Sequence, residues 1–245
     1  MQRLLAFLLC LPAFGTITLV QKQAANSTSG VTSQAVTMGS TPTVGDIIVV
    51  GWVDNANGGA VYFTDNQSTR NAYQIAPRFY TGGISGSFIG SGIACATVTV
   101  ASGTFTITLH SSNTSFISMF AVEYSGGSCI PDQIPVGVTG TTSPFSCGGS
   151  FTTANANDLL VAVIDYNLAS GTAAFGAGSG FTIQLSQTSS TDQPGAYEDQ
   201  IVSSTGTFNP EFTAGANATS TCVSAAFEAA AAPPSGGQKG FPIVQ

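Results

Sequence analysis

The stretch GDIIVVGWVDN at residues 45–55 decides the fold, because it recurs as NDLLVAVIDYN at residues 157–167. Each copy is a turn followed by an apolar run with the length of a buried strand. Two more segment pairs recur in the same order: residues 98–105 with 201–208, and residues 118–123 with 223–228. Ordered self-similarity of this kind is typical of a repeated structural unit. The sequence therefore predicts an internal duplication, with halves at about residues 16–125 and 126–230.

Both halves read as all-β. Residues 104–110, TFTITLH, alternate small polar and apolar side chains, which is typical of a strand with one buried face. No segment shows a helical period, and the strand signals have the spacing of β-sandwiches. Two separate immunoglobulin-like domains or one two-fold sandwich would fit a repeat of this size. We expect one jelly-roll-like antiparallel β-sandwich over residues 16–230, with Trp52 in its core.

Composition limits the partners. Charged residues are only 7% of the 245-residue chain, whereas hydrophobic residues make up 43%. The formal net charge is −7, and the permanent cations are few and scattered: Arg3, Lys22, Arg70, Arg78 and Lys239. A nucleic-acid-binding surface needs a stripe of Lys and Arg to neutralise phosphates. We therefore expect no nucleic-acid partner.

The N-terminus has the layout of a secretory signal. Arg3 precedes an apolar run at residues 4–11, Pro12 breaks the run, and AFG at residues 13–15 fits a small-x-small cleavage site. The run is shorter than the roughly 20 apolar residues of a membrane-spanning helix. We expect cleavage after Gly15 and a mature protein that is extracellular or on the cell surface, not membrane-spanning. The alternative is an uncut first strand.

Without the signal, the chain has an even set of cysteines: Cys95, Cys129, Cys147 and Cys222. In an exported protein this set favours two disulfides. Metal ligation is the lesser alternative, because no CxxC pair is present and His110 is distant from the cysteines in sequence. Among three possible pairings we expect Cys129–Cys147, which would close a Pro- and Gly-rich surface loop, and Cys95–Cys222, which would join the two halves.

The sequence contains no recognisable motif for nucleophilic catalysis. His110 is its one histidine and follows an alternating run, as a strand-end residue does, and no GxSxG, HExxH or P-loop pattern occurs. Glycoside hydrolysis needs only two carboxylates, but the neighbours Glu198 and Asp199 would point to opposite faces of a strand. We therefore expect a protein that is not an enzyme, with a carboxylate-dependent glycosidase as the least favoured alternative.

The remaining acidic residues fit structural roles. Asp46 and Asp158 precede strands as turn residues, and Glu123 and Glu228 end strands at equivalent positions of the two halves. We expect no cofactor, although acidic turns can bind Ca²⁺. The weak calcium candidates, which turn formation explains equally well, are Asp54 and Asp65.

Carbohydrate binding would need an aromatic platform with polar groups beside it. The candidate aromatic residues, which we expect in loops, are Tyr62, Tyr73, Phe79, Tyr80, Tyr166 and Tyr197. None of them forms a specific motif. Four N-x-S/T sequons are candidate glycosylation sites on the surface: Asn26, Asn66, Asn113 and Asn217.

The last residues, 231–245, combine a linker with an apolar tail. The linker AAPPSGGQK is followed by GFPIVQ at residues 240–245. Through Phe241, Ile243 and Val244, such a tail could add a strand to an exposed sheet edge of a neighbouring subunit. A frayed terminus is the alternative.

Four segments carry a resemblance to known proteins: GDIIVV at 45–50, TDN at 64–66, AVEYSG at 121–126 and AAFE at 225–228. With these strand and turn patterns the chain resembles a diffuse group of secreted bacterial β-sandwich domains, most of them uncharacterised. The resemblance implies fold and export and carries over no catalytic residue. From all these features we expect a non-catalytic extracellular structural or adhesive subunit that partners like subunits or extracellular glycans and self-assembles through its tail. The alternative is a lectin-like carbohydrate-binding module.

Overall fold

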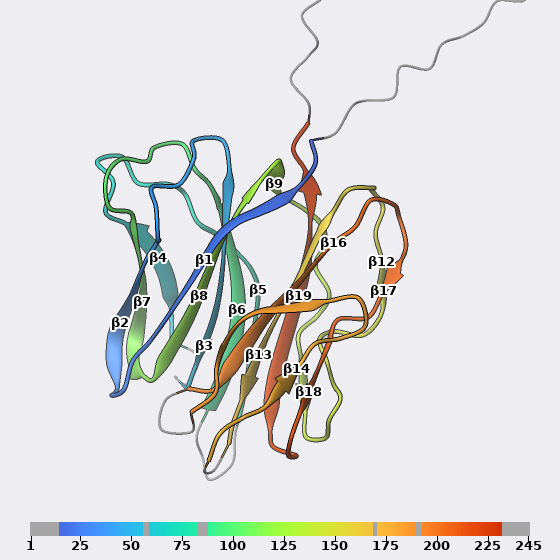
Figure 1. Cartoon of the computed structure of the whole chain (residues 1–245). Coiled ribbons are helices and arrows are strands. Elements are labelled where there is room, and N and C mark those ends of the chain that lie inside the picture. Colours follow the sequence, from blue (N-terminus) through green and yellow to red (C-terminus); the bar gives the residue numbers. More distant parts are fainter. Residues whose placement is uncertain (1–14, 56–58, 83–87, 169–170, 190–192, 232–245) are drawn as a thin grey trace, which may run out of the picture.

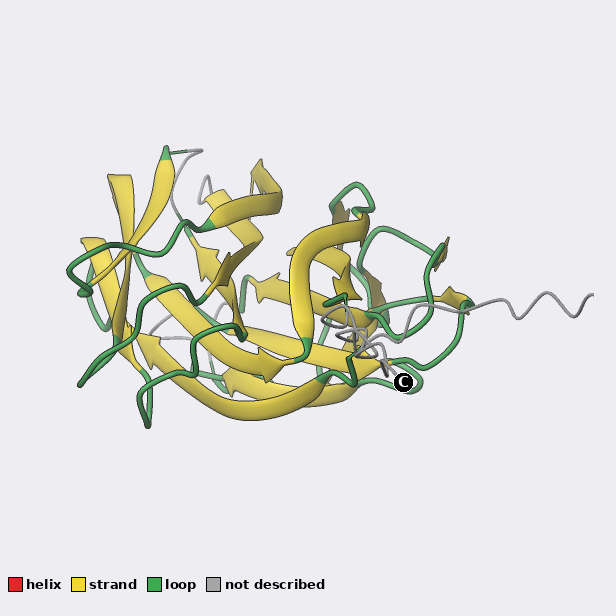
Figure 2. Ribbon diagram, turned by 90° about the horizontal axis from the view of Figure 1, so that it is seen from above, coloured by secondary structure: helices red, strands yellow, loops and turns green. Residues whose placement is uncertain are grey.

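A computed structural model describes residues 15–231 except 56–58, 83–87, 169–170 and 190–192. Within these residues every secondary-structure element is a strand and every pairing is antiparallel, as Figure 2 shows from above. The all-β antiparallel sandwich predicted from the sequence is confirmed. No helix long and apolar enough to cross a membrane occurs in this part of the chain. The expected signal and tail lie outside it, apart from Gly15 and Ala231.

The first half forms two sheets. Its strands are β1 (Thr18–Asn26), β2 (Val31–Thr37), β3 (Ile47–Asp54), β4 (Val61–Asp65), β5 (Gln74–Gly82), β6 (Phe88–Thr97), β7 (Thr106–Ser115) and β8 (Ile117–Ser125). The five-stranded sheet has the order β1-β8-β3-β6-β5, and the three-stranded sheet has the order β2-β7-β4. The small sheet covers the outer face of the large one (Figure 1).

The second half forms one main sheet and several shorter outer strands. Its strands are β9 (Gly127–Gln133), β10 (Val138–Gly140), β11 (Phe145–Ser146), β12 (Phe151–Thr152), β13 (Leu159–Tyr166), β14 (Phe175–Gly176), β15 (Thr182–Gln187), β16 (Gly195–Ile201), β17 (Thr207–Phe208), β18 (Glu211–Ala214) and β19 (Ser220–Ala229). The main sheet has the order β10-β19-β13-β16-β15, with β9 also paired to β19. Outside it lie the sheet β11-β18-β14 and the pair β12-β17.

The two main sheets place corresponding strands in corresponding positions. The repeated apolar stretches form β3 and β13, which lie at the centre of their sheets, each between the closing strand of its half and a second long strand. Gly45 and Asn157, the aligned first residues of the two copies, both have positive φ, 100° and 62°. In both turns this residue therefore adopts the left-handed backbone conformation, which Gly and Asn tolerate best. The duplication itself stays a prediction.

The main sheets face each other, so the molecule has four layers rather than two. Along β3 the side chains alternate: Ile47, Val49 and Val53 enter the core between the main sheets, and the intervening residues enter the core beneath the outer sheet. Strand β13 does the same, with Leu159, Val161 and Val163 in the shared core. Burial on both faces explains why these strands read as unbroken apolar runs. Each large side chain contributes about 1.5–3 kcal/mol by leaving water.

Trp52 occupies the core beneath the outer sheet of the first half, as expected. Its side chain is fully buried and packs edge-on against Phe63, with ring centroids 5.2 Å apart. Gly92 lies opposite Trp52 in the neighbouring strand, and a Cβ atom there would overlap the indole ring. The absence of a side chain at residue 92 therefore makes room for the tryptophan.

All four cysteines form disulfides, but both expected pairings are wrong. The structure joins Cys95 to Cys129 and Cys147 to Cys222. Cys95 points into the core between the main sheets, whereas Cys222 lies in the core beneath the outer sheet of the second half, so these two side chains face away from each other. The bridge between the halves is Cys95–Cys129, which links β6 to β9.

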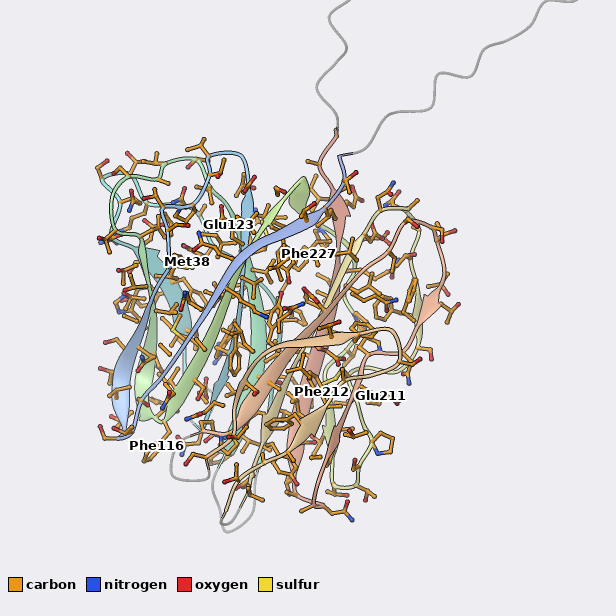
Figure 3. All side chains as sticks on the ribbon, viewed as in Figure 1. Met38, Phe116, Glu123, Glu211, Phe212 and Phe227 are labelled. Atoms are coloured by element: carbon orange, nitrogen blue, oxygen red, sulfur yellow. A yellow bond between two sulfur atoms is a disulfide. The ribbon has the colours of Figure 1, made fainter. Side chains whose placement is uncertain are left out.

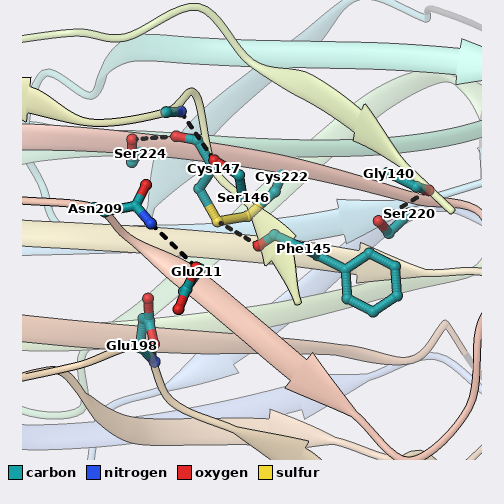
Figure 4. Close-up of a disulfide and its surroundings, with 12 residues drawn as sticks. Gly140, Phe145, Ser146, Cys147, Glu198, Asn209, Glu211, Ser220, Cys222 and Ser224 are labelled. Atoms are coloured by element: carbon teal, nitrogen blue, oxygen red, sulfur yellow. Dashed lines mark hydrogen bonds between the residues drawn. A yellow bond between two sulfur atoms is a disulfide. The ribbon is translucent and has the colours of Figure 1, made fainter. Parts of the chain in front are cut away.

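The second bridge belongs to the second half alone. Cys147 follows β11 and bonds Cys222 in β19, and its carbonyl oxygen accepts a hydrogen bond from Ser224 at 2.6 Å (Figure 4). The Cys147–Cys222 disulfide therefore fastens the outer strands to the main sheet. The segment between Cys129 and Cys147 is no stapled surface loop, because it contains β10 and β11 and each cysteine bonds elsewhere.

Candidate functional site

Most of the carboxyl groups are inside the protein. Eight of the chain's twelve acidic side chains are buried: Asp46, Asp54, Asp65, Glu123, Asp158, Asp165, Glu198 and Asp199. Burying an ionised carboxylate is costly unless it is paired or hydrogen-bonded, and its usual response is a raised pKa. The hydrogen-bond partners and charged neighbours of these carboxyl groups therefore determine whether each one is ionised and can act chemically.

A polar network lies between the two main sheets. Tyr124 of β8 donates a hydrogen bond to Asp199 of β16 at 2.5 Å, and its hydroxyl lies 3.2 Å from that of Tyr197. Gln184 of β15 donates to the other Asp199 oxygen at 2.8 Å and accepts a hydrogen bond from Lys22 of β1 at 2.7 Å. The network runs from the buried core to an exposed ammonium group and ties four strands together.

Burial sets the protonation in this network. It raises the pKa of Asp199, and the hydrogen bonds from Tyr124 and Gln184 and the charge of Lys22 act in the opposite direction. Burial also raises the pKa of both tyrosines well above their usual value, reinforced by the carboxyl of Asp199. Both phenols therefore stay neutral donors. The arrangement stabilises a buried carboxylate between the sheets.

A second carboxyl cluster lies at the other ends of β3 and β13. Asp165 accepts hydrogen bonds from the backbone NH of Gly90, at 2.8 Å, and from Gln193. Its pKa is raised well above the usual range, first by burial and then by the negative charge of Asp54 at the end of β3. Asp54, a weak calcium candidate, is thus fully buried beside another carboxyl group.

Both turn acids, Asp46 and Asp158, lie near other carboxyl groups. Burial and the neighbouring Glu123 raise the pKa of Asp46 to about 6. Burial, Asp132 and Glu228 raise the pKa of Asp158 to about 7. Asp158 is fully buried, and neither of its oxygens accepts a hydrogen bond from an amide or hydroxyl group. The negative charges of Asp132 and Glu228 favour its protonated form, because two ionised carboxylates repel each other. In Figure 3, Glu123 lies toward the same end of the molecule as Phe227.

Asp65, the other calcium candidate, organises a turn. Its carboxylate accepts hydrogen bonds from the backbone NH of Gln67 at 3.2 Å and from the backbone and side-chain amides of Asn71 at 3.1 and 2.8 Å. Donors from the protein thus occupy its oxygens. Among the described residues no group of three His, Cys, Asp or Glu side chains is arranged to hold a metal ion.

Glu198 and Asp199 point to opposite faces of β16, as their adjacency predicts. Asp199 faces the core between the main sheets, whereas Glu198 accepts a hydrogen bond from the backbone NH of Gly178 at 3.0 Å on the other face. Burial raises the pKa of Glu198 to about 8, and the negative charge of Glu211 adds to this (Figure 4). The two neighbouring carboxyl groups therefore cannot act on one substrate.

The aromatic candidates separate into buried and exposed residues. Tyr166 and Tyr197 are strand residues of the core and cannot form a platform, which corrects the expectation of loop positions. Phe79 packs against the core between the main sheets, and Tyr73 packs against Phe63 beneath the outer sheet. Tyr80 belongs to β5, but its side chain lies outside the described structure.

Tyr62 is the exception. It lies in β4, is 57% exposed, and stacks on His110 of β7 with ring centroids 4.6 Å apart and planes inclined by 9°. His110 Nε2 lies 2.9 Å from the hydroxyl of Thr64, which fixes the imidazole ring. These three side chains form the polar aromatic platform of the outer sheet. The expectation that His110 ends a strand is wrong, because β7 continues to Ser115, and its stacking partner follows from the register of β4 and β7.

The sequons and the small pockets add little to this picture. All four sequon asparagines are exposed, so they remain candidate glycosylation sites: Asn26, Asn66, Asn113 and Asn217. A pocket of about 330 Å³ beside Tyr166 is lined by Leu168, Thr172 and small residues. A second pocket, of about 360 Å³, lies over residues 38–41 and 103–105. No charged side chain lines either pocket.

The expected assembly residues of the tail, Phe241, Ile243 and Val244, lie outside the described residues.

Sequence reasoning missed Tyr124, Gln184 and Gln193 altogether. Their partners come from distant strands of the other half or of the same sheet, and no local spacing marks them. The chain matches no protein-family model, no curated protein and no solved structure, so its function is inferred from these residues.

Proposed function

We propose that this chain is a non-catalytic extracellular structural or adhesive subunit. The observation that carries the proposal is the location of the reactive groups: the carboxyl groups of Asp165 and Asp199 and the phenols beside Asp199 are buried and hydrogen-bonded between strands. A catalytic group needs a substrate within hydrogen-bond reach, and these groups are buried by the sheets that they join. They hold the four layers in one arrangement.

The cysteines support the extracellular part of the proposal. Two disulfides form from the four described cysteines, and disulfides persist mainly in oxidising compartments. Cys95–Cys129 fastens the two main sheets to each other across their shared core. A subunit that bears mechanical load benefits from such a covalent link, because separation of the halves would then require breaking a bond.

The described ends of the chain support assembly through the tail. The backbone NH of Ala230 donates a hydrogen bond to the carbonyl oxygen of Gly126 at 2.8 Å, and the exposed Ala231 is the last described residue before the tail (Figure 1). The tail therefore starts from the surface and not from the core. Strands β5 and β15 lie at the ends of their main sheets, and an edge strand is a template for an added strand.

Assembly is tested by electron microscopy and analytical ultracentrifugation of the purified secreted protein. The intact chain is expected to form oligomers or filaments, and a chain that ends before Gly236 is expected to stay monomeric. A control with Phe241→Ser and Ile243→Ser keeps the length and removes the apolar side chains. If the intact chain is monomeric and also adheres to no cell surface, the proposal is wrong. Equal assembly of both chains would disprove the role of the tail alone.

A glycosidase has no support from the structure. The neighbouring pair Glu198 and Asp199 is divided between two faces of β16. The other carboxyl pairs are structural partners of turns and strand ends.

A further inference from the structure

We propose that the edge strand β4 carries a binding subsite for neutral hexopyranose polysaccharides, formed by the free ring face of Tyr62. This inference rests on the proposed adhesive role and names the surface and the ligand class for it. It starts from the exposure of the ring: among the side chains that the structure describes, Tyr62 is the aromatic residue classed as exposed, at 57%.

The sheet order leaves one face of this ring open. Tyr62 and His110 are direct cross-strand partners, and their nearly parallel rings are 4.6 Å apart, about the spacing of neighbouring strands. The stack therefore runs across the sheet from β7 to β4. Because β4 is the last strand in the order β2-β7-β4, the second face of the Tyr62 ring points beyond the sheet edge.

The ring is also held in place. His110 supports one face of Tyr62, and Thr64 holds the imidazole through the contact of 2.9 Å between Thr64 Oγ1 and His110 Nε2. An exposed side chain that is already ordered loses less conformational entropy when a ligand binds. Tyr62 is thus prepared for binding, in contrast to an isolated surface tyrosine.

The surrounding face selects the chemistry of the ligand. The outward residues of the three strands beside the stack are Ser33, Ala35, Thr64 and Thr108, which are small and uncharged. Asp65, the acidic residue of β4, is buried on the other face of the sheet. A flat aromatic ring with neutral hydroxyl groups beside it fits the C–H face and the hydroxyl groups of a neutral pyranose. These four small side chains offer no cation to an anionic glycan and no carboxylate to a cationic one.

One ring supports only weak binding, so the ligand must be a polymer. An open stacking contact contributes on the order of 1 kcal/mol beyond its buried area. Repeated sugars along a polysaccharide and repeated copies of Tyr62 in an assembled protein would raise the total avidity 10²–10⁴-fold, the usual range for linked sites. The subsite and the proposed self-assembly therefore reinforce each other.

The test is native affinity electrophoresis of the intact chain in gels that contain soluble neutral glucans, mannans or galactans, with alginate and heparin as anionic gels. The wild type is expected to be retarded by at least one neutral polymer and by neither anionic one. Tyr62→Ala is expected to bind at least about fivefold more weakly, and Tyr62→Phe within about twofold of the wild type, because the ring carries the contact. Val136→Ala, at a residue that is 80% exposed, is the matched control and should not differ from the wild type.

The other outcomes overturn either the inference or the proposed function. Retardation that survives in Tyr62→Ala would exclude this subsite, provided that circular dichroism shows the wild-type fold. Equal loss in Tyr62→Phe and Tyr62→Ala would exclude stacking. Retardation by anionic polymers alone, or by none, would exclude the ligand class. If the wild type forms filaments but no polysaccharide retards it, the subsite is excluded and the proposed function stands. A retarded chain that neither assembles nor adheres would contradict the proposed function instead.

Discussion

Raising the pH from 5 to 7 is expected to destabilise the protein, and the substitution Glu198→Gln is expected to remove much of this loss. Burial raises the pKa of Glu198 from its usual 4.5 to about 8 in the folded state. The folded protein therefore binds more protons than the unfolded chain between these values. A group of this kind stabilises the fold fully below about pH 4.5, and its contribution is lost as the pH rises toward 8.

The size of the effect follows from the same values. One pKa unit corresponds to about 1.4 kcal/mol, so Glu198 alone lowers the free energy of unfolding by about 2.5 kcal/mol between pH 5 and pH 7. Asp158, with a pKa of about 7, and Asp46, with a pKa of about 6, act in the same direction. The wild-type loss is therefore larger than that of one group.

The assay is urea unfolding followed by circular dichroism at pH 5, 6 and 7. The Glu198→Gln side chain cannot ionise but keeps an oxygen that can accept the hydrogen bond from Gly178, so the slope of stability against pH should become shallower by about 1.2 kcal/mol per pH unit. Glu211→Gln is the matched control and should keep most of the wild-type slope, because Glu198 still titrates. Wild-type stability that is constant or rises from pH 5 to 7, or an equal slope in Glu198→Gln, would refute the reasoning.

Three other predictions concern the core. Cys95→Ser removes the disulfide between the main sheets, whose cysteines are 34 residues apart. In the chain-entropy model this should lower the free energy of unfolding by roughly 4 kcal/mol, as measured by urea unfolding. An unchanged midpoint would contradict the covalent link. Gly92→Ala places a methyl group against Trp52, so it should lower the free energy of unfolding by about 3 kcal/mol or more and change the tryptophan fluorescence spectrum. A wild-type spectrum and a wild-type urea midpoint would show that the indole ring does not lie against residue 92. Tyr124→Phe removes a donor to the buried Asp199 and should cost about 1–3 kcal/mol at pH 7; a loss below about 0.5 kcal/mol would mean that the bond is not formed.

The sequence predicted those features of the fold that depend on local patterns. The unbroken apolar run of β3 indicated a buried strand, and the structure shows that the strand is buried on both faces, between two cores. Trp52 was assigned to the core from its place in that run, and the opposite directions of Glu198 and Asp199 follow from the two-residue period of a strand.

Features that depend on how distant strands meet were not predictable. The pairing of Cys95 with Cys129 requires knowing which face of each sheet a cysteine occupies, and sequence spacing does not contain that information. Tyr197 was expected on the surface because tyrosine suits a binding loop, but its hydroxyl finds a partner inside, across the sheets. The platform of Tyr62 and His110 likewise depends on the register of β4 with β7.

The most direct test of the proposed function is immunogold electron microscopy of the cells that produce this protein. The proposal predicts gold label outside the cell, on surface-attached assemblies or released filaments, and little label within it. Label confined to the cell interior would contradict the extracellular structural or adhesive role.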